Sequence, residues 1–112
     1  MDKADAAQAF AAVGSVPRLE VLTCLVRAGA GGLVVKDIQE RTGVPASTLA
    51  HHLKMLVSAG LVTQEKHGRE TINRPDLARL EALSAYIIEQ CCADSPAEPA
   101  SKNDKEMASC TP

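Results

Sequence analysis

Residues Leu33 to Val62, with the sequence LVVKDIQERTGVPASTLAHHLKMLVSAGLV, decide how the chain folds. Two segments of this stretch carry apolar residues at helical spacing, so that each helix gains one buried face. These residues are Val35, Ile38, Leu49, Leu53 and Leu56. Between the segments, Gly43 tolerates a positive φ and Pro45 stops the first helix from continuing. A short helix, a tight turn and a longer helix with polar outer residues predict a helix-turn-helix that binds DNA.

Two helices are predicted before this unit. An Ala-rich helix over residues 2–13 has four side chains available for packing, which are Ala7, Phe10, Ala11 and Val13. A second helix follows over residues 17–28, because Ser15 is a good N-cap and Pro17 suits the first turn. The glycines at positions 29, 31 and 32 then end this helix and make a flexible connection.

A hairpin and a final helix are predicted after it. Residues 61–65 and 70–73 have strand character around His67-Gly68, and a hairpin directly after a recognition helix is a wing. The last helix extends from residue 76 to about residue 92. Its apolar stripe consists of Leu77, Leu80, Leu83, Ile87 and Cys91. The predicted fold class is mainly α with a small β-hairpin wing (α+β), a winged helix-turn-helix.

Size and composition indicate one domain with an aliphatic core. The chain has 112 residues, 46% of them hydrophobic, and Phe10 and Tyr86 are its only aromatic residues besides histidine. We assign residues 1–92 to the winged domain. Residues 93–112 are expected to form a flexible tail that carries Cys110, because prolines and polar residues replace the aliphatic ones. Pairing the first and last helices across a two-fold axis would bury their apolar stripes, so we expect a homodimer.

Nothing in the sequence predicts a membrane segment or an export signal. No run of about 18 apolar residues is present, and the first 15 residues carry acids and lack an apolar h-region. We therefore expect a cytoplasmic protein without a membrane partner. In that compartment the four cysteines are expected to be reduced, and their clustering indicates metal binding or redox sensing. They are Cys24, Cys91, Cys92 and Cys110.

The net charge of −2 hides a basic segment. Residues 36–74 contain six Lys or Arg and four acids, whereas residues 75–112 contain three bases and seven acids. The positive charge therefore lies on the helix-turn-helix and the wing, where double-stranded DNA would present its phosphates. The candidate DNA contacts are Ser47, Thr48, His51, His52, Lys54, Lys66, His67 and Arg69.

These contacts have plainer alternatives. Ser47 or Thr48 could serve only as a helix cap, and the wing tip could be a solvated turn instead of a phosphate or minor-groove contact. His51 and His52 are not expected to bind a metal, because neighbouring side chains on a helix diverge by about 100° and no third ligand accompanies them. We expect His52 to pack or to contact phosphate and His51 to face the groove.

Several motifs together resemble the ArsR/SmtB family of metalloregulatory repressors over roughly residues 5–92. They are Pro17-Arg18-Leu19, Ala46-Ser47-Thr48-Leu49, His52-Leu53-Lys54-Met55-Leu56, Ala59-Gly60-Leu61-Val62 and Gly68-Arg69. The resemblance implies a winged-helix homodimer that binds a palindromic operator and releases it when an inducer arrives. Two residues depart from the family pattern: Ala50 replaces a frequent serine of the recognition helix, and Asn73 replaces an aromatic residue of the wing.

The family places its inducer sites in different elements, and two of these are absent. The cysteine pair of the founding arsenic sensors aligns with Val34-Val35-Lys36, and the last helix does not supply the ligands of the zinc sensors. What remains resembles the arsenic-responsive subgroup with three thiolates at and beyond the end of the last helix. This resemblance implies that the inducer is As(III), or else Sb(III) or methylarsenite, without a constitutive cofactor. The implied ligands are Cys91, Cys92 and Cys110.

The chemistry of As(III) suits such ligands, because it is a soft centre that takes three sulfur donors. Adjacent cysteines diverge on an ideal helix, so Cys91 and Cys92 converge on one atom only if the helix end frays. Cys110 follows 18 residues later, and closing that loop costs roughly a few kcal/mol. The alternative is that Cys91 is a small buried hydrophobe, which leaves Cys92 and Cys110 unexplained.

Cys24 allows a second hypothesis. Some relatives sense persulfides by linking a cysteine of the second helix to one of the last helix, but they carry the former where this chain has Thr23. A shift of one residue turns the side chain by about 100°, so we expect a core role for Cys24. A switch with Cys91 or Cys92 is the alternative.

The leading functional hypothesis is thus an arsenite-responsive transcriptional repressor. The alternatives are a thiol-redox or persulfide-responsive repressor of the same fold and a constitutive DNA-binding module without an inducer. An enzyme is not expected, because the sequence offers no nucleophile-base-acid set and no cofactor loop.

Overall fold

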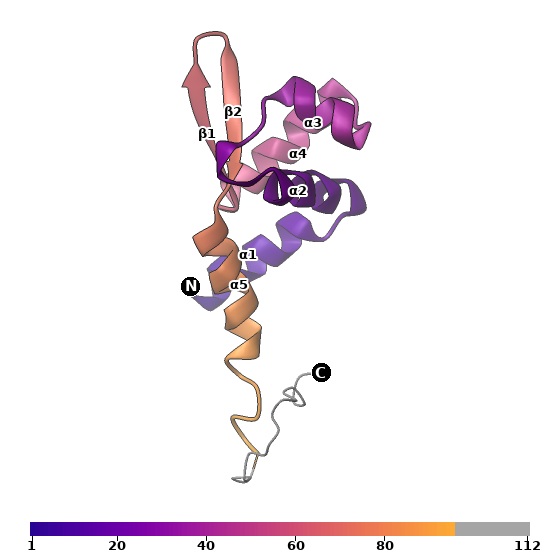
Figure 1. Cartoon of the computed structure of the whole chain (residues 1–112). Coiled ribbons are helices and arrows are strands. Elements are labelled where there is room, and N and C mark those ends of the chain that lie inside the picture. Colours follow the sequence, from indigo (N-terminus) through magenta and orange to yellow (C-terminus); the bar gives the residue numbers. More distant parts are fainter. Residues whose placement is uncertain (96–112) are drawn as a thin grey trace.

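The structure is a computed structural model, and it describes residues 1–95. Its elements are α1 (Lys3–Val13), α2 (Val16–Ala28), the 3-10 turn η1 (Gly29–Gly31), α3 (Val35–Thr42), α4 (Ala46–Ser58), β1 (Val62–His67), β2 (Glu70–Pro75) and α5 (Leu77–Ile88). The predicted mainly α fold with a β-hairpin wing is confirmed. In Figure 1 the hairpin and α3 lie at one end of the molecule and the end of α5 lies at the other.

Local side chains determine how α1 and α2 are joined. Asp2 Oδ1 accepts a hydrogen bond of 2.8 Å from the Asp5 N–H, and Ser15 Oγ accepts one of 3.3 Å from the Arg18 N–H. Both are N-caps, and Ser15 acts as predicted. Arg18 Nε also donates to the Ala12 carbonyl over 2.6 Å, which satisfies an oxygen left unpaired at the end of α1. The two helices therefore meet at a defined angle of 100°.

The core lies around α2, and the helices of the helix-turn-helix pack onto it. Its largest fully buried side chains are Val21, Leu25, Ile38, Leu49, Leu56, Leu61, Val62 and Asn73. Of the five apolar residues predicted for the helix-turn-helix, four are buried and Val35 packs partly against them. Each fully buried aliphatic side chain contributes roughly 1.5–3 kcal/mol, so this burial holds α3 and α4 against α2.

The packing face of α1 differs from the prediction. The buried residues are Ala6, Ala9 and Ala12, whereas Ala7, Phe10 and Ala11 are exposed. Val13 is partly buried, as predicted. A helix made largely of alanine has little contrast between its faces, so the sequence pattern does not select one. Contacts with α2 and α4 select the face that lacks the bulky Phe10.

The turn and the wing follow the prediction. Gly43 ends α3 with a φ of 77°, in the left-handed region that glycine tolerates. Strands β1 and β2 pair antiparallel from Val62↔Pro75 to His67↔Glu70. Each strand extends two residues beyond its predicted end, and Gly68-Arg69 form the connecting turn. The wing is therefore a longer hairpin than the sequence pattern indicated.

Helix α5 ends earlier than predicted. It stops at Ile88 instead of reaching residue 92, and the chain continues in turns. The N–H of Cys91 donates to the Ile88 carbonyl, three residues back, over 2.9 Å, which is the tighter pattern typical of helix ends. Cys91 is consequently exposed and not part of a helical stripe, so its interpretation as a small buried hydrophobe is wrong. The remainder of the predicted tail, with Cys110, lies outside the described residues.

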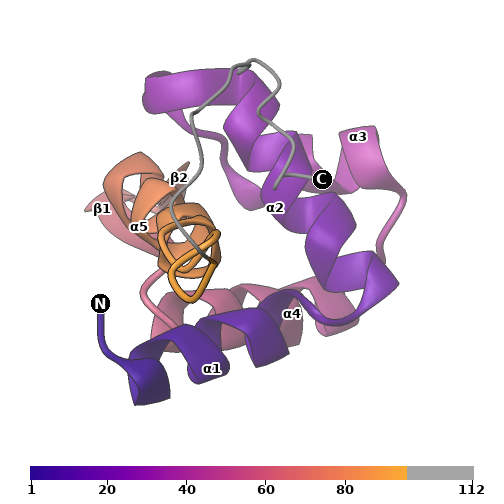
Figure 2. The same ribbon diagram turned by 90° about the horizontal axis from the view of Figure 1, so that it is seen from below.

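The first and last helices leave an apolar surface uncovered in the single chain. Figure 2 shows α5 end-on, with α1 and α2 on two sides of it. Phe10 of α1 and Leu77, Ile87 and Ile88 of α5 are all at least 40% exposed. Within residues 1–95 no single helix is long and apolar enough to cross a membrane, although α1 and α2 meet that test as a bent pair.

Candidate nucleic-acid interface and cysteine pair

Helix α4 places its polar residues on the side opposite the core. Ser47, Thr48, His51 and Lys54 are exposed, while three leucines of the same helix are buried. The residue before α4 is Pro45, and no side chain caps the helix. Thr48 Oγ1 instead donates to the Pro45 carbonyl over 3.0 Å. Because neither Ser47 nor Thr48 accepts a capping hydrogen bond, both oxygens stay available as acceptors, and the capping alternative is wrong.

His52 is half-buried beneath this surface. Its Nδ1 is buried and has no hydrogen-bond partner among the described residues. Burial lowers the pKa of His52 below its ordinary value, and Arg18 and His51 lower it further. The imidazole is therefore neutral at pH 7 and brings no positive charge to a phosphate, which fits the predicted packing role. Within residues 1–95 no group of three His, Cys, Asp or Glu side chains is arranged to hold a metal ion.

The wing concentrates its uncompensated positive charge at the tip. Glu65 Oε2 lies 3.0 Å from His67 Nε2, and the other carboxylate oxygen pairs with Arg74. Hydrogen bonds from His67 and then from Arg74 lower the pKa of Glu65. Lys66 and Arg69 are exposed and have no ion-pair partner among the described residues. These two cations are thus available for the phosphate contacts that remain a prediction for the wing tip.

Sequence reasoning missed the residue that anchors the wing, which is Asn73. Its side chain is fully buried, its Nδ2 donates to the Leu33 carbonyl over 3.1 Å, and its Oδ1 accepts from Gln64 Nε2 over 2.8 Å. The backbones of Leu33 and Asn73 also exchange two hydrogen bonds of 2.8 and 2.9 Å. A buried side chain with this set of partners fixes one register, so the wing is tied to the connection between α2 and α3.

Gly32 makes this approach possible. It has a φ of 74°, and a Cβ at this position would lie 2.7 Å from the Asn73 carbonyl oxygen. Arg74 adds a hydrogen bond of 3.0 Å from its Nε to the Ala30 carbonyl. The available signals were the glycines before Leu33 and the asparagine at a position where the family has an aromatic residue.

The structure brings Cys91 and Cys92 together. Their Sγ atoms are 3.4 Å apart, well beyond the disulfide bond length of about 2.05 Å. Two sulfurs bound to one tetrahedral zinc at about 2.3 Å would be separated by about 3.8 Å, so the observed spacing is near that of two donors on one atom. Cys92 has a φ of 63°, outside the helical region. The chain has therefore left the helix before the pair, which is the condition for adjacent cysteines to converge.

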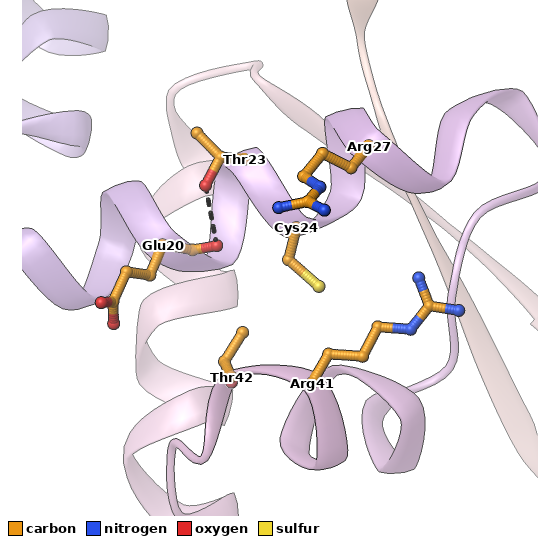
Figure 3. Close-up of a pocket in the computed structure, with 6 residues that line it drawn as sticks. All are labelled: Glu20, Thr23, Cys24, Arg27, Arg41 and Thr42. Carbon is orange, nitrogen blue, oxygen red and sulfur yellow. Dashed lines mark hydrogen bonds between the residues drawn. The ribbon is translucent and has the colours of Figure 1, made fainter.

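Cys24 has different surroundings. It is buried and lines a cavity whose walls come from α2 and α3. The expected core position is confirmed, but the side chain points into the cavity (Figure 3).

Comparison with known proteins agrees with this geometry. Residues 18–65 match the family described as a helix-turn-helix domain. The structure of an ArsR-like transcriptional regulator from Rhodococcus sp. RHA1 is 33% identical, with a TM-score of 0.69, over 81% of this chain and 82% of that one. The chain belongs to the ArsR family. It is a transcriptional regulator with a winged helix-turn-helix DNA-binding domain, and this family is not one of enzymes.

Two other solved structures also match over most of the chain. A homodimeric winged helix-turn-helix DNA-binding domain from Mycobacterium bovis is 26% identical, with a TM-score of 0.60, over 85% of this chain and 88% of that one. A possible transcriptional regulator for arsenical resistance is 27% identical, with a TM-score of 0.58, over 80% of this chain and 97% of that one. A search of curated proteins found no significant match.

Proposed function

We propose that this ArsR-family protein is an arsenite-responsive repressor that binds operator DNA as a homodimer in the cytoplasm. As(III) is the inducer, with Sb(III) and methylarsenite as chemical relatives, and its ligands are Cys91, Cys92 and Cys110. The observation that carries the proposal is the 3.4 Å separation of Cys91 Sγ and Cys92 Sγ at an exposed helix end. As thiolates, two sulfurs at this spacing would suit a thiophilic centre, and the similarity to a possible transcriptional regulator for arsenical resistance supports the proposal.

Dimerisation follows from the uncovered apolar surface of α1 and α5. Ile87 and Ile88 are 57% and 62% exposed in the single chain, and a two-fold partner would bury them. The similar domain from Mycobacterium bovis is a homodimer. Two copies place two α4 helices and two wings against the half-sites of an operator. Ser47, Thr48, His51, Lys54, Lys66, His67 and Arg69 are the proposed DNA contacts, and His52 supports them by packing beneath this surface.

The position of the cysteine pair connects the inducer to the dimer. The Cys91 N–H donates to the Ile88 carbonyl over 2.9 Å, so the first cysteine is linked directly to the last apolar residue of α5. As(III) bound by three thiolates would reorder the turns after Ile88. This would change how two α5 helices pack and therefore how far apart the two DNA-binding units lie.

The redox alternative gains no support from the surroundings of Cys24. The cavity that Cys24 lines is formed by residues of α2 and α3, and neither Cys91 nor Cys92 contributes to it. A disulfide requires Cα atoms about 4.4–6.8 Å apart, and in Figure 1 the end of α5 lies away from α2. In the arsenic proposal, two of the three sulfurs already lie 3.4 Å apart.

Titration of the operator-bound, full-length protein with arsenite tests the proposal, with fluorescence anisotropy of labelled DNA as the readout. We expect release at low micromolar arsenite. Cys91→Ser or Cys92→Ser should raise the required concentration at least about 100-fold, because losing a ligand costs more than the roughly 10–100-fold seen for second-shell partners. Cys110→Ser should also impair release, and Cys24→Ser is the matched control that should respond normally.

Two results would contradict this proposal in different ways. DNA that stays bound at saturating arsenite would exclude the inducer, and a normal response of Cys110→Ser would exclude the three-thiolate site. If persulfide released the operator and Cys24→Ser abolished that response, the redox alternative would be correct.

A further inference from the structure

A cavity of about 430 Å³ lies between α2 and α3, on elements that the proposed function does not use for sensing. Its volume is within the range of about 300–1,000 Å³ that is usual for small-molecule sites. The lining residues are Glu20, Thr23, Cys24 and Arg27 from α2, and Arg41 and Thr42 from α3. Figure 3 shows Cys24 pointing into the space, with Arg27 and Arg41 on one side and Glu20 on the other.

The two arginines are the feature that points to a ligand. Among residues 1–95 neither guanidinium has an ion-pair or hydrogen-bond partner. Each lies in the last turn of its helix, where the helix dipole favours a cation. Both arginines are exposed to solvent and line the same cavity, so an anion bound there could interact with two positive charges at once. The guanidinium fork suits a carboxylate in particular.

The other polar groups of the cavity narrow the choice of ligand. Thr23 Oγ1 donates to the Leu19 carbonyl over 3.0 Å, and Thr42 Oγ1 donates to the Ile38 carbonyl over 2.7 Å. Both hydroxyl protons are therefore already used within the helices. Glu20 remains as an acceptor at the end away from the arginines, and it suits an ammonium or hydroxyl group.

We propose that this cavity binds a small organic acid whose carboxylate pairs with Arg27 and Arg41 and whose ammonium or hydroxyl group faces Glu20. The ligand would bridge α2, around which the core is built, and α3, the first helix of the helix-turn-helix. Its binding would hold α3 in one position against α2 and so favour one arrangement of the DNA-binding surface. This is a second input, independent of As(III) and of the cysteine pair.

Protection of Cys24 from alkylation tests this proposal in the full-length, arsenic-free protein. Iodoacetamide labelling of the Cys24 peptide is followed by mass spectrometry with L-glutamate, L-malate or succinate present at constant ionic strength. Glutamate and malate carry the required donor group, and succinate is the matched acid without it. We expect glutamate or malate to protect Cys24 from alkylation in a saturable way. The apparent affinity of succinate should be at least about tenfold weaker, because succinate cannot make the charge-assisted hydrogen bond to Glu20.

Variants of the cavity give the second part of the test. Arg27→Gln and Arg41→Gln should each weaken protection at least about tenfold, and Glu20→Gln should remove the preference over succinate. Lys36→Gln, an exposed cation of α3 that does not line the cavity, is the matched control and should bind like the unmodified protein.

Three results would overturn the proposal. It is wrong if none of the three acids protects Cys24 at tens of millimolar, if succinate protects it as well as glutamate and malate do, or if both arginine variants show the same protection as the unmodified protein. If Arg27→Gln and Arg41→Gln instead weakened operator binding and lowered its salt dependence without any protection by the acids, the arginines would be phosphate contacts. None of these outcomes depends on arsenite, so the proposed repressor function is judged separately.

Discussion

The DNA-binding unit, consisting of α3, α4 and the wing, and the end of α5 are built in opposite ways. In the DNA-binding unit, Ile38, Leu49 and Leu56 are fully buried, and Asn73 ties the wing to the backbone before α3. At the end of α5, Ile88 is 62% exposed and the cysteines follow in turns beyond the helix. The first region completes its packing within one chain. The second leaves apolar surface of the single chain exposed to solvent, so it holds its shape less tightly than the first.

The two regions are nevertheless joined by a very short connection. Only Asp76 separates β2 of the wing from α5. Its N–H donates to the Leu61 carbonyl over 2.8 Å, and its Oδ1 caps α5 by accepting from the Arg79 N–H over 3.0 Å. A change in the direction of α5 therefore acts directly on the base of the wing. Because the end of α5 is packed less tightly than the DNA-binding unit, α5 can change direction at lower cost than α3, α4 and the wing can.

The largest effect is expected from shortening one aliphatic side chain in each region. Leu56→Ala removes a fully buried side chain and should lower the free energy of unfolding by about 2–5 kcal/mol. Ile88→Ala should cost less than about 1 kcal/mol in the dilute monomer, because most of this side chain is already in water. It should instead weaken the dimer. Urea unfolding at several protein concentrations, with sedimentation of the dimer, measures both effects.

If Leu56→Ala and Ile88→Ala lowered the free energy of unfolding equally at protein concentrations too low for dimerisation, the contrast between the two regions would be wrong. Such a result would mean that Ile88 packs within its own chain as tightly as Leu56 does.

The features that the sequence predicted are those with a local pattern. Helical spacing identified Ile38 and Leu49, Gly43 marked the turn, and Gly68 marked the wing tip. Ser15 was recognised as a cap because capping involves only the next three residues. For the cysteine pair, the sequence indicated only the condition that the helix must end before adjacent residues can meet; the helix was predicted to reach residue 92, whereas it ends at Ile88.

The features that were missed depend on contacts between segments far apart in the chain. Asn73 meets Leu33 across 40 residues, and no local pattern encodes that contact. Contacts with α2 and α4 determine which face of α1 is buried. The cavity beside Cys24 forms between α2 and α3, which are separate segments of the chain. Sequence patterns predict which elements form, whereas tertiary packing determines which buried polar groups and cavities result.

A medium effect is expected at the wing tip, where the DNA-binding unit carries exposed charge. Arg69→Ala removes a cation without an ion-pair partner in the described chain and should weaken operator binding several-fold. It should also lower the slope of log K against log salt by about 1, as for one lost phosphate contact. Lys3→Ala, an exposed cation of α1, is the matched control and should leave both quantities unchanged. An unchanged slope for Arg69→Ala would remove the wing tip from the interface.

The smallest effect concerns His52, a half-buried group beneath the DNA-binding surface whose pKa is lowered. Burial, Arg18 and His51 hold its pKa below the unfolded value of 6.5 in the native state. The unfolded chain therefore binds a proton at a higher pH than the folded chain does, so stability is full above pH 6.5. It should fall as the pH drops from there through the folded pKa. Melting temperatures at pH 7.5 and pH 5.5 measure this loss of stability. The loss should be smaller in His52→Gln. It should be unchanged in His67→Gln, the matched control at the exposed wing. An undiminished loss in His52→Gln would place the acid sensitivity elsewhere in the chain and would separate it from the burial of this imidazole.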